Sequence, residues 1–405
     1  MPYGAFNGVA AVALPFLLRR DGTSVAHIAA IEALVQAPAI WYVLWAPAVD
    51  FGLRRRNWIV ILSLVSGITT ALALRLTTLA GWHTATELFV VASAFNQPVS
   101  SAIGALVASV MPDAMHGRAA GWTQAGILCA GVIASGVTIW MSGHVARSTI
   151  GIILGVMIVC PSLVALFVPE PMPVRARIGA HLGRMWREIA GTFRRREAWL
   201  GVVFFVSPVG AGALMNLFAG VAPEFHASAT DVVGVAAVGG LMMSAGALLG
   251  GYVLDRTSRW RIYPLAGTLC AVSVGAMVLA PLRPITYLLG AAGYAFSTGI
   301  AYAAFMALAL QLLGSEQAAS GTRFTLFTAA VNIPVVYMLR LDGLGQARFG
   351  VRGMLATDAL ANLAFAALLF LITMRSATVG APATLSHRHP RGSTTKGPEG
   401  APERP

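Results

Sequence analysis

Apolar residues run along the chain in blocks of roughly twenty, and short polar joints separate the blocks. A helix of about 20 apolar residues is long enough to cross the hydrocarbon core of a bilayer, so each block predicts one membrane-spanning helix. The blocks lie at about 2–19, 25–47, 58–78, 84–110, 119–142, 148–168, 198–222, 231–254, 262–281, 284–313, 322–341 and 353–375. The pattern therefore predicts an all-α membrane protein with twelve transmembrane helices.

Composition supports this fold class. Of the 405 residues, 57% are hydrophobic and 11% are charged, whereas soluble domains carry about 25% charged residues. Cys129, Cys160 and Cys270 fall inside predicted helices without a CxxC pair or a nearby histidine, so neither a disulfide framework nor a zinc site is supported. We expect small core residues at these positions and predict no metal and no cofactor.

The positions of the basic residues predict the orientation of the chain. Most of them fall in joints on one side of the membrane and in the C-terminal tail, and cytoplasmic loops carry an excess of Lys and Arg. Both termini are therefore expected in the cytoplasm. Nearly every basic residue is an arginine, which favours a GC-rich bacterial genome and hence the bacterial inner membrane. The first block is short for a span, which leaves open a start upstream of Met1.

Two polar landmarks recur at one spacing. Asp50 and Asp255 follow the second and eighth blocks and lie 205 residues apart. Arg118 and Arg323 open the fifth and eleventh blocks and are also 205 residues apart. One offset shared by unrelated landmarks indicates a duplicated six-helix unit. We therefore expect two pseudo-symmetric six-helix bundles.

The duplication predicts the domain organisation. An N-terminal bundle would cover 1–168 and a C-terminal bundle 198–375. Between them, 169–197 carries apolar residues at helical spacing and arginines on the other faces, which favours an amphipathic connector on the cytoplasmic membrane surface. The alternative is a solvated linker. Residues 376–405 are rich in Pro and Gly, and we expect a disordered cytoplasmic tail.

A charged phrase follows the second block as "WAPAVDFGLRRRNW" and the eighth as "GGYVLDRTSRWRIY". The phrase resembles the signature of the major facilitator superfamily of secondary transporters, G-x-x-x-D-[RK]-x-G-[RK]-[RK]. The residues at its positions are Asp50, Arg54 and Arg55 in the first copy and Gly251, Asp255, Arg256 and Arg259 in the second. The resemblance implies a twelve-helix transporter in which this phrase controls conformation.

Residues 34–60 also look like the branch of muropeptide permeases and acetyl-CoA transporters, which carry a W-[AS]-P-x-x-D stretch followed by arginines and a tryptophan. That branch has two acids in helix 4. Here Gln97 is kept, while Pro98 and Ala102 stand at the acidic positions. The resemblance to this branch therefore does not carry proton coupling through helix 4.

Alternating access requires contacts between the halves that can break. We expect Asp50 to meet the start of helix 11 near Arg323, and Asp255 to meet the start of helix 5 near Arg118, whenever the inner face is shut. We call these expected contacts the inner latches. The alternative for Arg54 to Arg56 is that these arginines only set topology.

Ionisable residues inside spans are costly and mark functional sites. Glu32 is the deepest acid, and Gln36 lies one turn further along the same helix. This stripe predicts a proton carrier at Glu32 facing a central cavity. The alternative is an acid hydrogen-bonded near the outer interface. Glu87 and Asp358 lie close to the outer ends of their helices, and we expect solvation there rather than a mechanism.

The resemblance implies that helices 1, 4, 7 and 10 line the path. The polar candidates for the substrate cavity on these helices and on helix 11 are Asn7, Asn96, Gln97, Asn216, Tyr294, Thr298 and Asn332. Together with Glu32 and Gln36 they predict a neutral or weakly charged organic solute, because no buried arginine suited to an anion is evident among them.

These features favour a secondary active transporter of a small organic solute, with proton coupling as one option. The alternatives are a drug or metabolite efflux pump of the same superfamily and a transport-inactive sensor or scaffold. A membrane enzyme is disfavoured because the eight histidines are dispersed without an acidic partner. The sequence has no Walker loop for direct use of ATP. The expected partners are the solute, the bilayer and protons, without nucleic acid, and the expected state is a monomer.

Overall fold

The regular elements of the described chain are all helices in the structure, a computed structural model. The residues that it describes are 1–45, 53–77, 81–110, 116–170, 183, 187, 191, 194, 196–254, 256–313 and 320–379. Most of the connector expected at 169–197 lies outside the described residues. So does the expected tail, except for 376–379, which continue the last helix.

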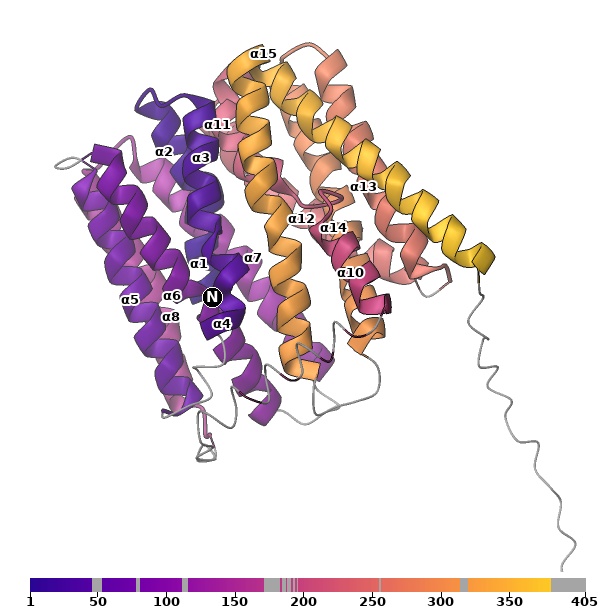
Figure 1. The fold of residues 1–405 in the computed structure, drawn as a ribbon. Helices are drawn as coiled ribbons and strands as arrows, with labels where there is room; N and C mark the ends of the chain where they lie inside the picture. Colours follow the sequence, from indigo (N-terminus) through magenta and orange to yellow (C-terminus); the bar gives the residue numbers. More distant parts are fainter. Residues whose placement is uncertain are drawn as a thin grey trace, which may run out of the picture.

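The described helices of the N-terminal half group into six spans, as the apolar blocks predict. They run side by side along the bundle (Figure 1). The first combines α1 (Pro2–Gly8), η1 (Val9–Ala13) and α2 (Leu14–Arg20), and the second combines α3 (Val25–Gln36) and α4 (Pro38–Trp45). The remaining spans are α5 (Arg55–Leu76), α6 (Gly81–Val110), α7 (His116–Met141), and α8 (Arg147–Leu163) with η4 (Val164–Phe167).

The C-terminal half repeats this plan. Its first span is built from α10 (Arg196–Val206), η5 (Ala213–Asn216), α11 (Phe218–Val221) and η6 (Ala222–Phe225). The following spans are α12 (Ala229–Leu254), α13 (Arg259–Leu279) and α14 (Pro284–Leu313). The last two spans form α15 (Ser320–Val379), which turns back at Gly350, where φ is 66° and ψ is −162°. Glycine is the residue that tolerates this conformation.

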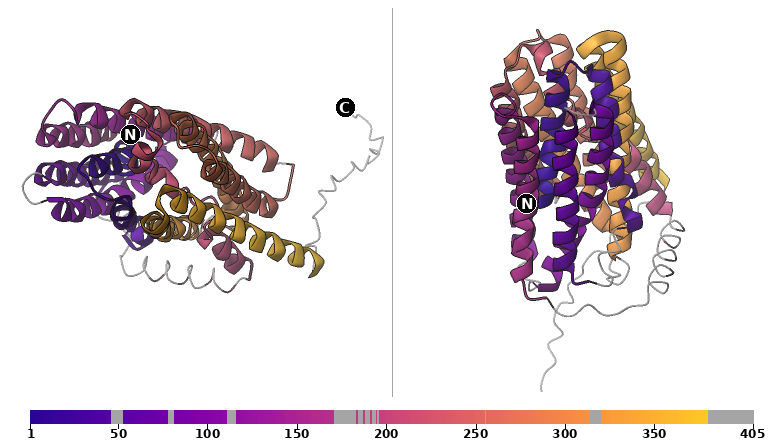
Figure 2. Two further views of the ribbon diagram at one scale, coloured as in Figure 1. Left: turned by 90° about the horizontal axis from the view of Figure 1, so that it is seen from above. Right: turned by 90° about the vertical axis from the view of Figure 1, so that its left-hand side faces the viewer.

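Equivalent helices make equivalent contacts in the two halves. In the N-terminal half α5 packs against α6 and α8, and in the C-terminal half α13 packs against α14 and α15. Between the halves, α3 contacts α15 and α7 contacts α12. α3 and α12 belong to the second spans of the two halves, and α7 and the first part of α15 are the fifth spans. The two interfaces are therefore equivalent in the repeat. The two six-helix bundles lie side by side when the molecule is viewed along its helices (Figure 2), so the pseudo-symmetric fold is confirmed.

Large apolar side chains cover the outside of the bundle. Phe167, Leu248 and Leu279 are 86%, 78% and 87% exposed, which is unfavourable in water and expected in lipid. In the described part of the chain, seven helical stretches are long and apolar enough to cross a membrane, and the last, Leu326–Met374, is long enough for two crossings. The prediction that all three cysteines are core residues is wrong, because Cys129 and Cys160 are exposed and only Cys270 of the three is buried.

Two spans are locally irregular where proline and glycine interrupt the hydrogen-bond pattern. The π-helical turn η1 directly precedes α2, in which Pro15 has no N–H to donate. The expected helix 198–222 is broken over 207–212, where Gly210 and Gly212 adopt positive φ angles of 65° and 72°. The apolar pattern alone did not predict this break.

The two ends of the bundle pack differently. At the end that carries the α2–α3 joint, which we call the closed end, one apolar cluster takes side chains from both halves. At the opposite end, which we call the split end, the N-terminal half has a cluster around Ile59, Val99 and Leu106, and the C-terminal half has a separate one around Phe205 and Phe305. Among the residues that the structure describes, the halves therefore share a core at the closed end and not at the split end.

Candidate functional site

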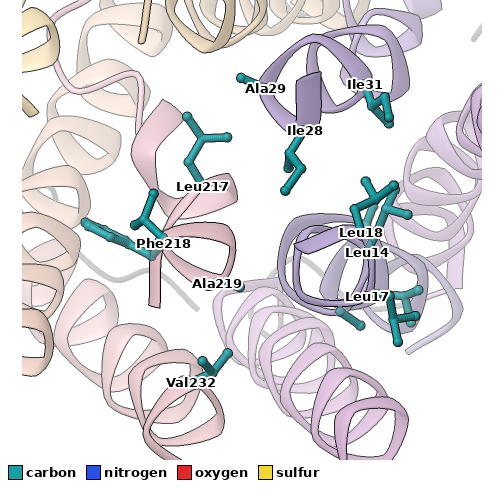
Figure 3. Packing of buried hydrophobic residues seen from close by; sticks show 14 of the residues in the cluster. Leu14, Leu17, Leu18, Ile28, Ala29, Ile31, Leu217, Phe218, Ala219 and Val232 are labelled. Carbon is teal, nitrogen blue, oxygen red and sulfur yellow. The ribbon is translucent and has the colours of Figure 1, made fainter. Parts of the chain in front are cut away.

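Apolar side chains from both halves seal the closed end. Leu14 and Leu17 on α2 and Ile28 on α3 belong to the same cluster as Leu217 and Phe218 beside α11 (Figure 3). Each of these five side chains is at most 2% exposed. A dry cluster of this kind excludes water and solutes from the interface between the halves.

An ion pair crosses the same interface. Arg19 Nη2 lies 2.7 Å from Glu224 Oε1, and both side chains are partly buried. The two residues are 205 positions apart, the same offset that separates Asp50 from Asp255. Their spacing thus matches that of the polar landmarks of the repeat, and their contact joins the two halves at the closed end. Neither residue was among the sequence candidates, although the repeat offset would have paired them.

Further polar contacts brace the closed end within the N-terminal half. Asp21, in the α2–α3 joint, accepts a hydrogen bond from the indole Nε1 of Trp82 at 2.8 Å and pairs with Arg147. Arg20 Nη1 donates to the backbone oxygen of Ser142 at 2.6 Å. These contacts tie the joint to the starts of α6 and α8.

Between the seal and the split end, α3 presents the two polar residues that the sequence singled out. Gln36 Nε2 donates to Asn216 Oδ1 at 3.2 Å, a second polar contact across the halves. Glu32, one turn before Gln36, is fully buried, and neither of its carboxylate oxygens has a hydrogen-bond partner. The alternative of an acid hydrogen-bonded near the interface is therefore not what the structure has.

The N-terminal wall of the site combines α1 and α6. Tyr3 donates from its hydroxyl to Gln97 Oε1 over 3.5 Å, and Asn96 Nδ2 donates to the backbone oxygen of Tyr3 at 3.4 Å. Asn7 lies one turn after Tyr3 on α1 and is half-buried. Asn96 Oδ1 is buried without a partner. Packing of α1 on α6 thus brings the predicted Asn7, Asn96 and Gln97 together with Tyr3.

The predicted residues of the C-terminal half do not form one wall. Thr298 on α14 is buried beside Cys270 on α13, with 3.9 Å between oxygen and sulfur. Tyr294 is fully buried and donates to Asp358. Asn332 Nδ2 donates to the backbone oxygen of Thr328 at 2.8 Å, within its own helix.

Asp358 was expected to be solvated, and this prediction is wrong. The residue is 1% exposed and accepts two hydrogen bonds, from the Tyr294 hydroxyl at 3.3 Å and from Asn362 Nδ2 at 3.0 Å. The sequence also missed Asp342, which was placed in a joint between spans. In the structure the helix continues past it to Gly350, and Asp342 is fully buried. By contrast Glu87 is exposed, as expected, and lies near His83.

In the first copy of the charged phrase, Glu170 holds the backbone of two arginines. The backbone N–H groups of Arg55 and Arg56 donate to the carboxylate of Glu170 at 3.0 Å and 3.2 Å. This carboxylate caps the start of α5. The backbone of Arg54 forms the N-cap position of the same helix.

In the second copy of the phrase, Arg256 lies over the ring of Tyr252 at 4.2 Å from its centroid. Arg259 Nη1 donates to the backbone oxygen of Ala307 on α14 at 3.2 Å. Gly251 has no atom within reach of an added Cβ. These contacts give the two arginines local partners besides any effect on topology.

The inner latches fall outside what the structure describes. Asp50 and Asp255 lie outside the described residues, as do the side chains of Arg118 and Arg323, whose backbones lie in the first turns of α7 and α15. The latches therefore stay a prediction. In the described part of the chain no three His, Cys, Asp or Glu side chains gather as metal ligands would.

Comparison with known proteins gives one family match and several matches of fold. The family model described as Major Facilitator Superfamily matches residues 1–336. The chain matches the crystal structure of a D-xylose-proton symporter with a TM-score of 0.70 at 12% sequence identity, over 91% of this chain and 94% of that one. It matches the nucleoside transporter NupG with a TM-score of 0.66 at 13% identity, over 92% and 96%.

A third match is a bacterial homolog of the human lysosomal transporter Spinster, in an inward-facing and unoccupied conformation. The TM-score is 0.67 at 14% identity, over 94% of this chain and 96% of that chain. At these identities the likeness concerns the fold. No curated protein sequence matches the chain, so the resemblance to muropeptide permeases and acetyl-CoA transporters stays a prediction.

Proposed function

Because the chain belongs to the Major Facilitator Superfamily, we propose that it is a secondary active transporter that carries a small organic solute across the bacterial inner membrane by alternating access. Family membership makes it a multi-pass membrane transport protein and not an enzyme. The observation that carries the proposal is the contrast between the ends in the described part of the chain, where one apolar core spans both halves at the closed end and separate cores occupy the split end.

The basic residues supply the orientation. Arg54 to Arg56 lie at the split end, and so do Arg256 and Arg259. Cytoplasmic joints are enriched in such residues, so the split end and the end of α15 face the cytoplasm, and the conformation is inward-facing. Met1 lies further inside the bundle, against Gly126 of α7. Movement of α3 and α2 away from α15 and α11 would open the closed end outwards, while the inner latches would shut the split end.

Glu32 supports coupling to protons. An ionised carboxylate that is buried without a partner is costly by several kcal/mol, so Glu32 is neutral and holds a proton in this conformation. Its helix forms the interface with α15, and Gln36 on the same face holds Asn216 of the other half. Separation of the halves would admit water to Glu32 and let the proton leave.

The solute is small and neutral or weakly charged. Tyr3, Asn7, Asn96 and Gln97 offer donors and acceptors without a formal charge. An anionic solute would need a buried cation beside these groups. The chain acts as a monomer, because each half finds its partner within the same polypeptide.

Transport into proteoliposomes tests the function. Neutral solutes are screened against purified protein with and without an inward-directed pH gradient, and Glu87→Gln serves as control because Glu87 is an exposed acid. We expect the gradient to accelerate uptake by the wild type and by Glu87→Gln. In Glu32→Gln, accumulation of the solute should fall to the level of protein-free liposomes. Movement of the solute down its own concentration gradient should persist.

Three other outcomes would change the proposed function. Equal accumulation by Glu32→Gln and the wild type would exclude Glu32 as the coupling residue. Accumulation that requires the opposite gradient direction would make the chain an efflux pump of the same fold. Tight binding of a solute without any flux would make it a transport-inactive sensor.

A further inference from the structure

The two limbs of α15 bring a pair of buried acids together. The limbs turn at Gly350 and touch closely one turn below it, where a Cβ added to Gly345 would collide with Gly353 and with Thr357 Oγ1. Asp342 lies one turn before Gly345, and Asp358 directly follows Thr357. Both carboxyl groups are therefore buried at the same level of the two limbs, close to the place where the limbs touch. At 1.5 Å per residue they lie about 12 Å from the turn along the helices.

The two acids have different surroundings. Asp358 accepts hydrogen bonds on both oxygens, from Tyr294 on Oδ1 and from Asn362 on Oδ2. Asp342 is fully buried, and neither of its oxygens has a partner. Two carboxyl groups that share one site cannot both ionise without strong repulsion. The arrangement suits one ionised acid that is stabilised by donors, Asp358, and one neutral acid, Asp342.

No described cation neutralises the pair. Tyr294 on α14 and Cys270 on α13 are the titratable groups that interact with it from neighbouring helices, and neither carries a positive charge. The titratable residues of α3, which packs against the first limb, are Glu32 and His27. The arginines of α15 nearest in sequence are exposed on its other faces: Arg340, Arg348 and Arg352. A buried charge must be paired or neutralised.

We propose that Asp342 and Asp358 together bind one exchangeable proton, which gives the C-terminal half a protonation site of its own, separate from Glu32. In the loaded form the proton is bonded to an oxygen of Asp342, and Asp358 is the carboxylate. On release the O–H bond of Asp342 breaks, its electron pair stays on the oxygen, and the proton passes to water. Both acids are then ionised, so release requires water to reach the pair.

A metal cation fits this site less well than a proton. Hard cations require several oxygen ligands. Both oxygens of Asp358 already face donors, the hydroxyl of Tyr294 and the amide Nδ2 of Asn362. A cation at the same oxygens would face these positive hydrogens. A proton needs only the free oxygens of Asp342.

The site is connected to the break in the first span of the C-terminal half. Asn362 Oδ1 accepts the backbone N–H of Gly210 at 3.1 Å, while Asn362 Nδ2 donates to Asp358. Tyr337, on the first limb, donates to the backbone oxygen of Val206 at 2.8 Å, on the other side of the break. Asn362 therefore connects Asp358 to the interrupted backbone. The charge that appears on Asp342 on release would act on the break through Asp358 and Asn362.

Infrared spectroscopy of the purified protein tests the site without any transport measurement. A protonated carboxyl group has a carbonyl band apart from that of carboxylates, and the band shifts when the exchangeable proton is replaced by deuterium. In the Glu32→Gln background, we expect a protonated carboxyl band that shifts in heavy water and disappears as the pH is raised. Asp342→Asn should abolish this band and lower the proton uptake measured between the same two pH values by one proton per chain.

Controls separate loss of the site from loss of the fold. Glu87→Gln removes an exposed acid and should leave the band in place. If Asp342→Asn fails to yield a folded protein, the heavy-water shift in the Glu32→Gln protein alone still decides whether a buried exchangeable carboxyl proton exists. Addition of sodium chloride at constant pH is a further control, and it should leave the protonated carboxyl band unchanged.

Two outcomes would overturn the proposal. One is the absence of any shifting carboxyl band at a pH where the protein is folded. The other is a band that sodium removes at constant pH, which would make the pair a cation site. Neither outcome depends on whether Glu32→Gln still accumulates solute, so this site and the proposed role of Glu32 fail separately.

Discussion

Arg19 and Glu224 lie in the two halves at the spacing of the repeat and carry opposite charges. In a perfectly symmetric duplication, the same residue would meet itself at the axis, and two like charges would repel each other. Divergence of the repeat to arginine in one half and glutamate in the other turns this repulsion into attraction. The closed end is thus held by an interaction that only a diverged repeat can make.

Removal of either charge should loosen the closed end. The pair is partly buried, and its loss costs about 1 kcal/mol, or about a five-fold shift in the equilibrium between closed and open outer ends. We expect Arg19→Ala and Glu224→Ala to raise by that factor the rate at which an impermeant thiol reagent, added outside, labels Ala219→Cys, with the native cysteines replaced by serine.

The swapped pair Arg19→Glu with Glu224→Arg provides the control, because it restores opposite charges and should return labelling to the slow rate. Ala219 is 3% exposed in the seal, so its labelling reports opening directly. Unchanged labelling in all three variants would mean that the apolar seal alone holds the end shut.

Single residues also mark the limit of inference from the sequence. Gln36 and Asn216 could be selected as polar residues inside apolar blocks, but their contact required the packing of one half on the other. Asp342 was missed because the first limb of α15 continues through polar residues that resemble a joint between spans in the sequence. Its burial arises from the second limb of α15 and from neighbouring helices, which no local pattern encodes.

Glycines set the closeness of particular helix pairs. A Cβ added to Gly246 on α12 would collide with the backbone oxygen of Phe296 on α14, and one added to Gly151 on α8 would lie 2.7 Å from the backbone oxygen of Ala71 on α5. Gly240, also on α12, has nothing within 4 Å. The four-residue spacing of Gly246 and Gly250 is visible in the sequence. The partner helix that leaves no room for a side chain at Gly246 is not.

This difference predicts opposite effects of one substitution on one helix. Gly246→Ala forces the backbones of α12 and α14 apart and should destabilise the protein by about 1–3 kcal/mol. Gly240→Ala meets no neighbour and gains helix propensity, worth up to about 1 kcal/mol. Thermal unfolding in detergent should give a lower midpoint for the first variant and an equal or higher one for the second. Equal midpoints would show that this helix contact adapts without cost.

The break at 207–212 illustrates why element boundaries escaped prediction. The block 198–222 is uniformly apolar and predicts one helix, yet "SPVGAG" within it contains Pro208, Gly210 and Gly212. These residues permit an interruption but do not require one. Asn362 and Tyr337 lie on α15, far along the sequence from the break. Their side chains form hydrogen bonds with backbone groups that flank the break. Distant side chains therefore decide that the span is broken.

At the scale of the whole molecule, the two ends are coupled because the halves move as bodies. Contacts at the closed end stabilise the inward-facing form, and the inner latches would stabilise the outward-facing form. Weakening one set must shift the population towards the form held by the other. This reciprocity gives the latches a test that does not require the transported solute.

Distances between spin labels follow this shift. One labelled pair, Leu53→Cys with Thr257→Cys, spans the split end, and another, Val145→Cys with Thr230→Cys, spans the closed end, all at exposed positions. In the outward-facing form the split-end distance is short and the closed-end distance is long. Replacement of both Asp50 and Asp255 by arginine should reduce the population of this form. Arg19→Ala should increase that population. Changes of the same sign at both ends would contradict alternating access.

The sequence by itself determined the spans, their number, their duplication and the family resemblance, because each depends on hydrophobic length, charge position and repeat spacing along one dimension. It also determined that Glu32 and Gln36 share a helix face. Only the tertiary structure decided which end is sealed, that Arg19 meets Glu224, and that Asp342 and Asp358 are both buried near the contact of the two limbs of α15. These features depend on the approach of segments far apart in the chain, where burial and partners, rather than residue type, fix what a side chain can do.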